Sequence, residues 1–272
     1  MNAFAQHFSF EFRAGIRNRT LLLLFYLFPL GFYFLASALM TGLNPTFRET
    51  LIPAMVFFSV LTGAMLGIPE PIIQAREAGI FRSYKIHGIP EISILLIPLL
   101  TTLMHIVLVT VVIVVTAPLL FDAVLPANWL GFLLAFLLMV MAATTFGLLL
   151  GVVAPNSQAA TLLGQAVFLP SMLIGGLMFP TSFLPDALGK LATLLPTTHA
   201  MNLYNVFARG LPFDLHPYLS VAVLYMGGAL ALGLAIYLFD WDRRNQTRHG
   251  HPALAFIATI PYLVAFVLAL IQ

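Results

Sequence analysis

Long apolar runs separated by short polar stretches make up most of the chain. A helix needs roughly 20 apolar residues to cross the roughly 30 Å of hydrocarbon in a bilayer, because each residue advances it by about 1.5 Å. Runs near or above this length are predicted to span at 20–41, 51–68, 92–120, 129–154, 159–179 and 218–239, and a seventh run, 252–271, closes the chain. The runs are continuous rather than alternating, so we predict spanning helices and not barrel strands.

An apolar stripe precedes the first run, with one residue every four positions at Phe4, Phe8, Phe12 and Ile16. This spacing predicts one face of a helix. Gly15 and Asn18 weaken its continuity with the first span. We therefore expect residues 1–19 to form an amphipathic helix on the inner membrane surface. The alternative is the start of one long first helix.

The composition of the chain indicates the same class of protein. Of 272 residues, 61% are hydrophobic and 8% are charged, whereas soluble domains carry about 25% charged residues. So little polar surface predicts an all-α, polytopic helical membrane protein. The net charge of +2 gives no indication of a nucleic-acid partner, and the absence of cysteine excludes disulfides and thiolate chemistry.

The distribution of Lys and Arg predicts the orientation. With the amino terminus inside, the inner pieces hold nine basic residues: Arg13, Arg17, Arg19, Arg76, Arg82, Lys85, Arg243, Arg244 and Arg248. The outer pieces hold three: Arg48, Lys190 and Arg209. This bias predicts a multi-pass protein of the plasma (inner) membrane with a cytoplasmic amino terminus. Residues 36–38 resemble a signal-peptide cleavage site, but the long first run favours an uncleaved helix.

The connector between the second and third spans, residues 68–90, gathers five charged residues: Glu70, Arg76, Glu77, Arg82 and Lys85. Pro69 and Pro71 are expected to break the preceding helix. A short helix over 72–85 is then predicted, ended by 88–90. The alternative is a solvated loop with ordinary positive-inside charges.

Several kinds of chemistry are missing from the sequence. A phosphate-binding loop needs Gly-Lys followed by Ser or Thr, yet Lys85 precedes Ile86 and Lys190 precedes Leu191. Any ATP must therefore be hydrolysed by another polypeptide, and we expect no cofactor, metal or catalytic residue on this chain. Solvated-loop positions are preferred for His249 and His251 over a metal site.

Two rival functions depend on buried histidines. The predicted spans contain no Asp, Glu, Lys or Arg, which argues against an ion-coupled secondary transporter. His105 is the relay candidate inside a span, although helix packing is the preferred interpretation. A membrane-embedded enzyme or assembly factor would need His105 or His199 as its reactive group.

Two motifs stand in the same order as in a known family. The first is Arg76-Glu77-Ala78-Gly79-Ile80-Phe81-Arg82, followed by Gly88-Ile89-Pro90. The second is Phe179-Pro180, Leu184-Pro185, Leu194-Leu195-Pro196 and Thr198-His199-Ala200. Together they resemble the ABC-2 type transporter permeases, in which an Arg-Glu-x-Gly pattern follows the second span and a proline-rich segment links the fifth and sixth. The resemblance covers about residues 1 to 245.

The resemblance implies a permease subunit that is not itself an enzyme. It would pair with an identical or closely related second permease, sit among membrane lipid, and dock onto ABC-type ATPase subunits carrying ATP and Mg. The coupling connector, 70–91, would contact the ATPase through Arg76, Glu77, Gly79, Ile80, Phe81 and Arg82. Glu77, Gly79 and Arg82 match the family pattern, while Ile80 and Phe81 would anchor the contact.

The resemblance also implies a transport path for an amphipathic, drug-like or lipid-like substrate. This path would lie between the second and fifth spans, with walls at Phe57, Phe58, Met65, Phe168 and Met172. Ordinary packing or lipid-facing positions are the alternative for these side chains. A re-entrant segment, 180–200, would form an outer gate or a static cap with Pro180, Pro185, Pro196 and His199.

One departure from the family concerns the last run. Family members usually stop after the sixth span, so the permease domain would cover 20–245 and leave 252–271 as an extra segment. This segment is long enough to cross, which would place the carboxy terminus outside. A hairpin on the inner leaflet is the alternative.

Overall fold

The computed structural model describes residues 3–44, 46–212, 215–241 and 250–271. It is 84% helical, with no strand in the described part of the chain. Seven of the described helices are long and apolar enough to cross a membrane: Arg19–Leu43, Phe47–Glu77, Ile92–Phe121, Trp129–Val153, Ser157–Ile174, Pro217–Leu238 and Pro252–Ile271. The all-α polytopic fold predicted from the apolar runs is confirmed.

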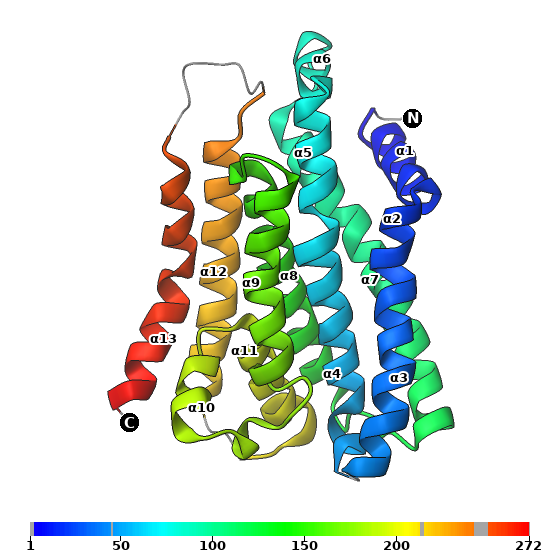
Figure 1. Cartoon of the computed structure of the whole chain (residues 1–272), viewed down its shortest axis with the longest axis vertical. Helices are drawn as coiled ribbons and strands as arrows, with labels where there is room; N and C mark the ends of the chain where they lie inside the picture. Colours follow the sequence, from blue (N-terminus) through cyan, green and yellow to red (C-terminus); the bar gives the residue numbers. More distant parts are fainter. Residues whose placement is uncertain (1–2, 45, 213–214, 242–249, 272) are drawn as a thin grey trace.

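The spans stand side by side in one bundle with two distinct ends (Figure 1). The N-terminal helix and the connector lie at one end, here called the connector end, and the short helices α10 and α11 lie at the other, the loop end. The elements are α1 (Ala3–Arg17), α2 (Arg19–Leu22), η1 (Leu23–Leu27), α3 (Phe28–Leu43), α4 (Phe47–Thr62), η2 (Gly63–Gly67), α5 (Pro69–Glu77), α6 (Ile80–Ile86), α7 (Glu91–Phe121), α8 (Trp129–Val153), α9 (Ser157–Ile174), η3 (Thr181–Phe183), α10 (Asp186–Ala192), α11 (Pro196–Leu203), η4 (Tyr204–Ala208), α12 (Pro217–Leu238), η5 (Pro252–Thr259) and α13 (Ile260–Ile271).

The second span forms the centre of the bundle. In its most apolar window 94% of residues are buried, compared with 28% in the first and third spans and 22% in the fifth. A helix that is apolar on every side is stable only when other elements surround it or when it faces lipid. Here other helices surround it, and its extension is the connector.

A π-helical segment of the second span, η2, is held between the fourth and fifth spans. A Cβ atom added to Gly147 of α8 would lie 2.0 Å from the Ala64 carbonyl oxygen, and one added to Gly164 of α9 would lie 2.6 Å from the Met65 carbonyl oxygen. Glycine therefore lets the backbones touch, as is common between helices in membranes. Three spans meet closely just before the connector begins.

The amphipathic helix α1 is separate from the first span. Asn18 has extended backbone angles, and its side-chain oxygen accepts hydrogen bonds from the backbone N–H groups of Thr20 and Leu21. This cap satisfies donors at the start of α2. The break expected near Gly15 and Asn18 thus falls at Asn18, while the position of α1 on the membrane surface stays a prediction.

His105 of α7 packs against α1 and so connects this helix to the bundle. Its ring stacks on Phe12 of α1 at a centroid distance of 4.8 Å and on Phe25 at 5.0 Å. The hydroxyl group of Tyr26 lies 2.6 Å from its Nδ1 atom. His105 is buried among aromatic rings, which agrees with the helix-packing interpretation.

The last segment runs beside α12 from the connector end to the loop end, where the carboxy terminus lies near α10 (Figure 1). Tyr262 is buried, and a Cβ atom added to Gly227 of α12 would lie 2.6 Å from its ring. The absence of a side chain at Gly227 therefore makes room for Tyr262. The segment lies along the bundle and does not fold back as a hairpin, while its crossing of the membrane stays a prediction.

Candidate functional site

The connector is built from two helices and not from the single helix predicted over 72–85. The second span continues through Pro69 and Pro71 as α5 and ends at Glu77. Prolines are tolerated here because they lie in the first turn after η2, where no N–H group is needed. The predicted break at the prolines is therefore wrong.

The chain turns instead at two glycines. Gly79 has φ +72° and Gly88 has φ +69°, a left-handed conformation that favours glycine. Gly79 separates α5 from α6, and Gly88 separates α6 from α7. Figure 1 shows α6 as the part of the connector that extends farthest from the bundle.

The side chains around the turn from α5 into α6 differ in exposure. The side chains of Glu77, Ile80 and Arg82 are exposed, Ile80 by 41%. Phe81 is only 4% exposed, and its ring centroid lies 5.3 Å from that of Phe239 at the end of the sixth span. The expectation that Phe81 is a surface anchor is therefore corrected, because its side chain packs inside the chain.

A second contact fixes α6 in the same place. The Nζ atom of Lys85 lies 5.6 Å from the ring centroid of Trp241, within the range of a cation–π interaction. Trp241 in turn contacts the ring of Phe239. The end of the sixth span thus supports α6 through aromatic side chains.

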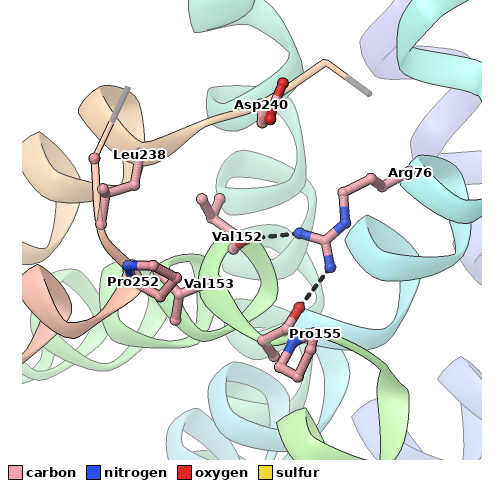
Figure 2. Close-up of a pocket in the computed structure, with 9 residues that line it drawn as sticks. Arg76, Val152, Val153, Pro155, Leu238, Asp240 and Pro252 are labelled. Atoms are coloured by element: carbon pink, nitrogen blue, oxygen red, sulfur yellow. Dashed lines mark hydrogen bonds between the residues drawn. The ribbon is translucent and has the colours of Figure 1, made fainter. Parts of the chain in front are cut away.

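Arg76 also points inward, which differs from its expected role as a surface contact. Its Nη1 atom donates to the Val152 carbonyl oxygen at 2.6 Å, and its Nη2 atom donates to that of Ala154 at 2.5 Å. Figure 2 shows the guanidinium group reaching from α5 to the turn after α8. The pocket beside it has a volume of about 110 Å³ and is also lined by Asp240 and Pro252.

A larger cavity of about 370 Å³ opens between the starts of the first and fifth spans and the second span. It is lined by Asn18, Thr20, Leu21, Leu24, Met65, Leu66, Pro69, Glu70, Pro71, Gln74, Ala160, Thr161 and Gln165. Apolar side chains alternate with neutral polar ones, and Glu70 is the ionisable member of this lining. Such a mixed surface suits an amphipathic ligand.

Most of the predicted pathway residues lie away from this cavity. Met65 lines it. Phe57 and Phe58 are fully buried, and Phe58 packs on Phe168 with ring centroids 5.6 Å apart. Met172 packs against the same core. The structure therefore places Phe57, Phe58 and Phe168 in the core, with Met172 partly buried against it. This is the alternative given for these four side chains, and it corrects their role as walls of an open path.

The predicted outer segment folds into short helices at the loop end. Pro180 and Pro185 directly precede η3 and α10, and Pro196 opens α11. Proline suits these places because the first turn of a helix leaves its N–H groups unpaired. The fold of the segment agrees with the expectation of short helices, while its role as a gate stays a prediction.

His199 connects this segment to the sixth span. It is fully buried, with Nε2 at 2.8 Å from the Thr193 carbonyl oxygen and Nδ1 at 3.1 Å from Oγ of Ser220. Burial lowers the pKa of His199 to about 4. Both ring nitrogens are engaged, so this histidine acts as a neutral structural tie.

Two contacts that shape the loop end could not be predicted from the sequence. Arg209 and Glu49 form an ion pair, and Arg48 lies 3.5 Å from Asp122. These pairs join segments that are distant in sequence. Their residue types are ordinary for loops, so only the fold reveals them.

Most of the chain, including the connector, is similar to a known protein family. Residues 3–208 match the family described as ABC-2 type transporter. The match includes the connector and the proline-rich segment, and it ends before the sixth and seventh spans. No curated protein matches the chain.

Proposed function

Since the chain belongs to the ABC-2 type transporter family and is thus the membrane permease component of an ABC transporter, we propose that it exports an amphipathic, drug-like or lipid-like substrate. A separate ABC-type ATPase subunit binds ATP and Mg and supplies the energy. Two permease chains, identical or closely related, form the membrane part in the plasma membrane. The connector end faces the cytoplasm, in line with the distribution of basic residues.

The projection of α6 from the bundle is the observation that carries this proposal. Ile80 and Arg82 lie on its exposed face, exposed Glu77 ends the preceding helix α5, and Gly79 lies at the turn between the two helices. Charged residues around an apolar one are suited to a polar protein interface, because the charges fix orientation and the apolar side chain is buried on contact. We assign the ATPase contact to these four residues.

The cavity between the first, second and fifth spans supports the substrate class. Its lining of leucine, methionine and amide side chains fits a molecule with both apolar and polar parts. In the proposed cycle, ATP binding moves the two permease chains relative to each other, and the loop-end helices open as the exit gate. Exposed apolar faces of the spans contact lipid or the second chain.

Purification of the tagged complex from its own organism in mild detergent tests the proposal. We expect an ABC-type ATPase to co-purify, and the double variant Glu77→Arg with Arg82→Glu to release it. The matched control is Asp186→Arg with Lys190→Glu, which makes the same charge changes at the loop end and keeps the ATPase bound. Absence of an ATPase from the wild-type preparation in several detergents would overturn the proposed function.

A further inference from the structure

We propose that Arg76 is a positioning residue that transmits movement of the connector to the turn between the fourth and fifth spans. The proposal rests on the proposed function, since it concerns how ATPase-driven movement enters the membrane. It gives Arg76 a role inside the permease. Its neighbour Glu77 keeps the contact with the ATPase.

The first step concerns unpaired carbonyl groups at the end of α8. In an α-helix the Gly151 carbonyl oxygen would accept a hydrogen bond from the N–H group of residue 155. Residue 155 is proline and has no N–H group. Arg76 supplies donors instead, with Nη1 at 3.4 Å from the Gly151 oxygen and at 2.6 Å from the Val152 oxygen.

The second step concerns why an arginine side chain suits the C-terminal end of α8. The C-terminal end of a helix carries partial negative charge, which a cation stabilises. The guanidinium fork spans the helix end, because Nη2 also donates to the Ala154 oxygen at 2.5 Å. Arginine can hold two carbonyl groups in a fixed plane, whereas lysine presents a single ammonium group. The contact therefore fixes direction as well as distance.

The third step is that close packing surrounds this contact. A Cβ atom added to Gly151 would lie 3.1 Å from Cα of Pro69 and 3.1 Å from Cδ1 of Ile72. Ile73 is fully buried and packs with Ala154 and Ala160. Together α5, the end of α8 and the start of α9 form one unit, here called the joint. A rigid contact of this kind passes on a displacement instead of absorbing it.

The fourth step is the position of the joint between the ATPase contact and the spans. Arg76 and Glu77 are consecutive, yet Arg76 faces the turn after α8 while Glu77 is exposed. A force on Glu77 is therefore applied one residue from the contact with the fourth span. The end of the sixth span and the start of the seventh line the small pocket beside Arg76 (Figure 2).

Spin-label distances in the complex with its ATPase test the proposal. The chain has no cysteine, so a single pair can be introduced without background. We choose two exposed positions of the joint, Gln74→Cys in α5 and Gln158→Cys in the first turn of α9. The distance is measured without nucleotide and after trapping with ATP, Mg and vanadate, once co-purification of the ATPase has been checked.

In the wild-type background we expect the same distance in both states, because the joint moves as one body. Arg76→Gln keeps the ATPase bound but gives a distance that shifts or broadens on nucleotide trapping. Arg76→Lys shows a smaller shift. Unchanged distances in Arg76→Gln with the ATPase bound would overturn the inference alone, whereas absence of the ATPase from the wild type would overturn the proposed function.

A second variant separates transmission from simple capping. Pro155→Ala restores an N–H group that can pair with the Gly151 oxygen. If Arg76→Gln with Pro155→Ala regains thermal stability while the distance still shifts with nucleotide, Arg76 acts as the link. Recovery of the wild-type distance in this double variant would show that Arg76 only caps α8, and would overturn the inference.

Discussion

Phe81 on the connector and Phe239 at the end of the sixth span pack with ring centroids 5.3 Å apart, both almost completely buried. This contact connects two segments that are about 160 residues apart in sequence and holds α6 in the position where its other face is exposed. Removal of the Phe81 ring should therefore affect the orientation of α6 before it affects the spans.

We expect Phe81→Ala to weaken ATPase co-purification although no exposed side chain is changed. Loss of a buried phenylalanine typically costs about 3 kcal/mol or more of stability, and here the loss falls on a short helix. Phe81→Leu should retain most of the binding because it refills part of the space. Equal binding by wild type and Phe81→Ala would show that this packing does not orient α6.

Close contact of the backbones at η2 predicts strong effects of single methyl groups. Gly147→Ala and Gly164→Ala place a Cβ atom against the carbonyl oxygens of Ala64 and Met65. Overpacking commonly costs about 1–3 kcal/mol, so both variants should melt at lower temperature in detergent. Gly31→Ala and Gly233→Ala are controls, since nothing lies within 4 Å of an added Cβ atom at either position. Similar melting of all four would contradict the packing described.

The aromatic setting of His105 predicts that phenylalanine can replace it. His105→Phe keeps a ring between Phe12 and Phe25 and loses the hydrogen bond with Tyr26. ATPase activity of the complex should stay within about threefold of wild type, the range that corresponds to loss of one hydrogen bond of modest strength. His105→Ala should expose α1 to proteolysis. Complete loss of activity in His105→Phe would instead support a proton relay.

The lowered pKa of His199, about 4, predicts acid sensitivity of the loop end. Below the usual pKa of about 6.5 an exposed histidine takes up a proton, while the folded protein keeps His199 neutral. Stability therefore falls as pH decreases from about 6.5 to 4, by at most about 1.4 kcal/mol per pH unit. Melting temperature measured across this range should decrease more for wild type than for His199→Gln. If the melting temperatures of wild type and His199→Gln decreased equally with pH, His199 would not be the neutral buried group described.

The spans and the break at Asn18 could be predicted because their causes are local. A run of about 20 apolar residues defines a span, and a capping residue before an apolar run defines a helix start. The same local rule failed at Pro69 and Pro71. The helix accommodates these two prolines because the π-helical segment η2 precedes them, and apolar periodicity does not reveal such a segment.

The roles of Arg76 and Phe81 could not be read from the sequence because their partners are distant. Arg76 binds carbonyl groups about 75 residues away, and Phe81 packs on a ring near the end of the sixth span. In a helix as short as α6, periodicity cannot tell the buried face from the exposed one. The packing of Phe58 on Phe168 also joins helices that are distant in sequence, so the sequence could not show whether these rings line a path or fill the core.

Site-directed cross-linking from α6 to the ATPase tests the central claim most directly. Single cysteines at Ile80, Arg82 and, as the control, Asp186 are placed in the cysteine-free chain, and the purified complex is treated with a short thiol-to-amine cross-linker. We expect Ile80→Cys and Arg82→Cys, which are exposed, to join the ATPase subunit, and Asp186→Cys, which is exposed at the loop end, to stay unlinked. Cross-links from Asp186→Cys, or none from Ile80→Cys and Arg82→Cys in a complex that hydrolyses ATP, would contradict the assignment of α6 as the ATPase contact.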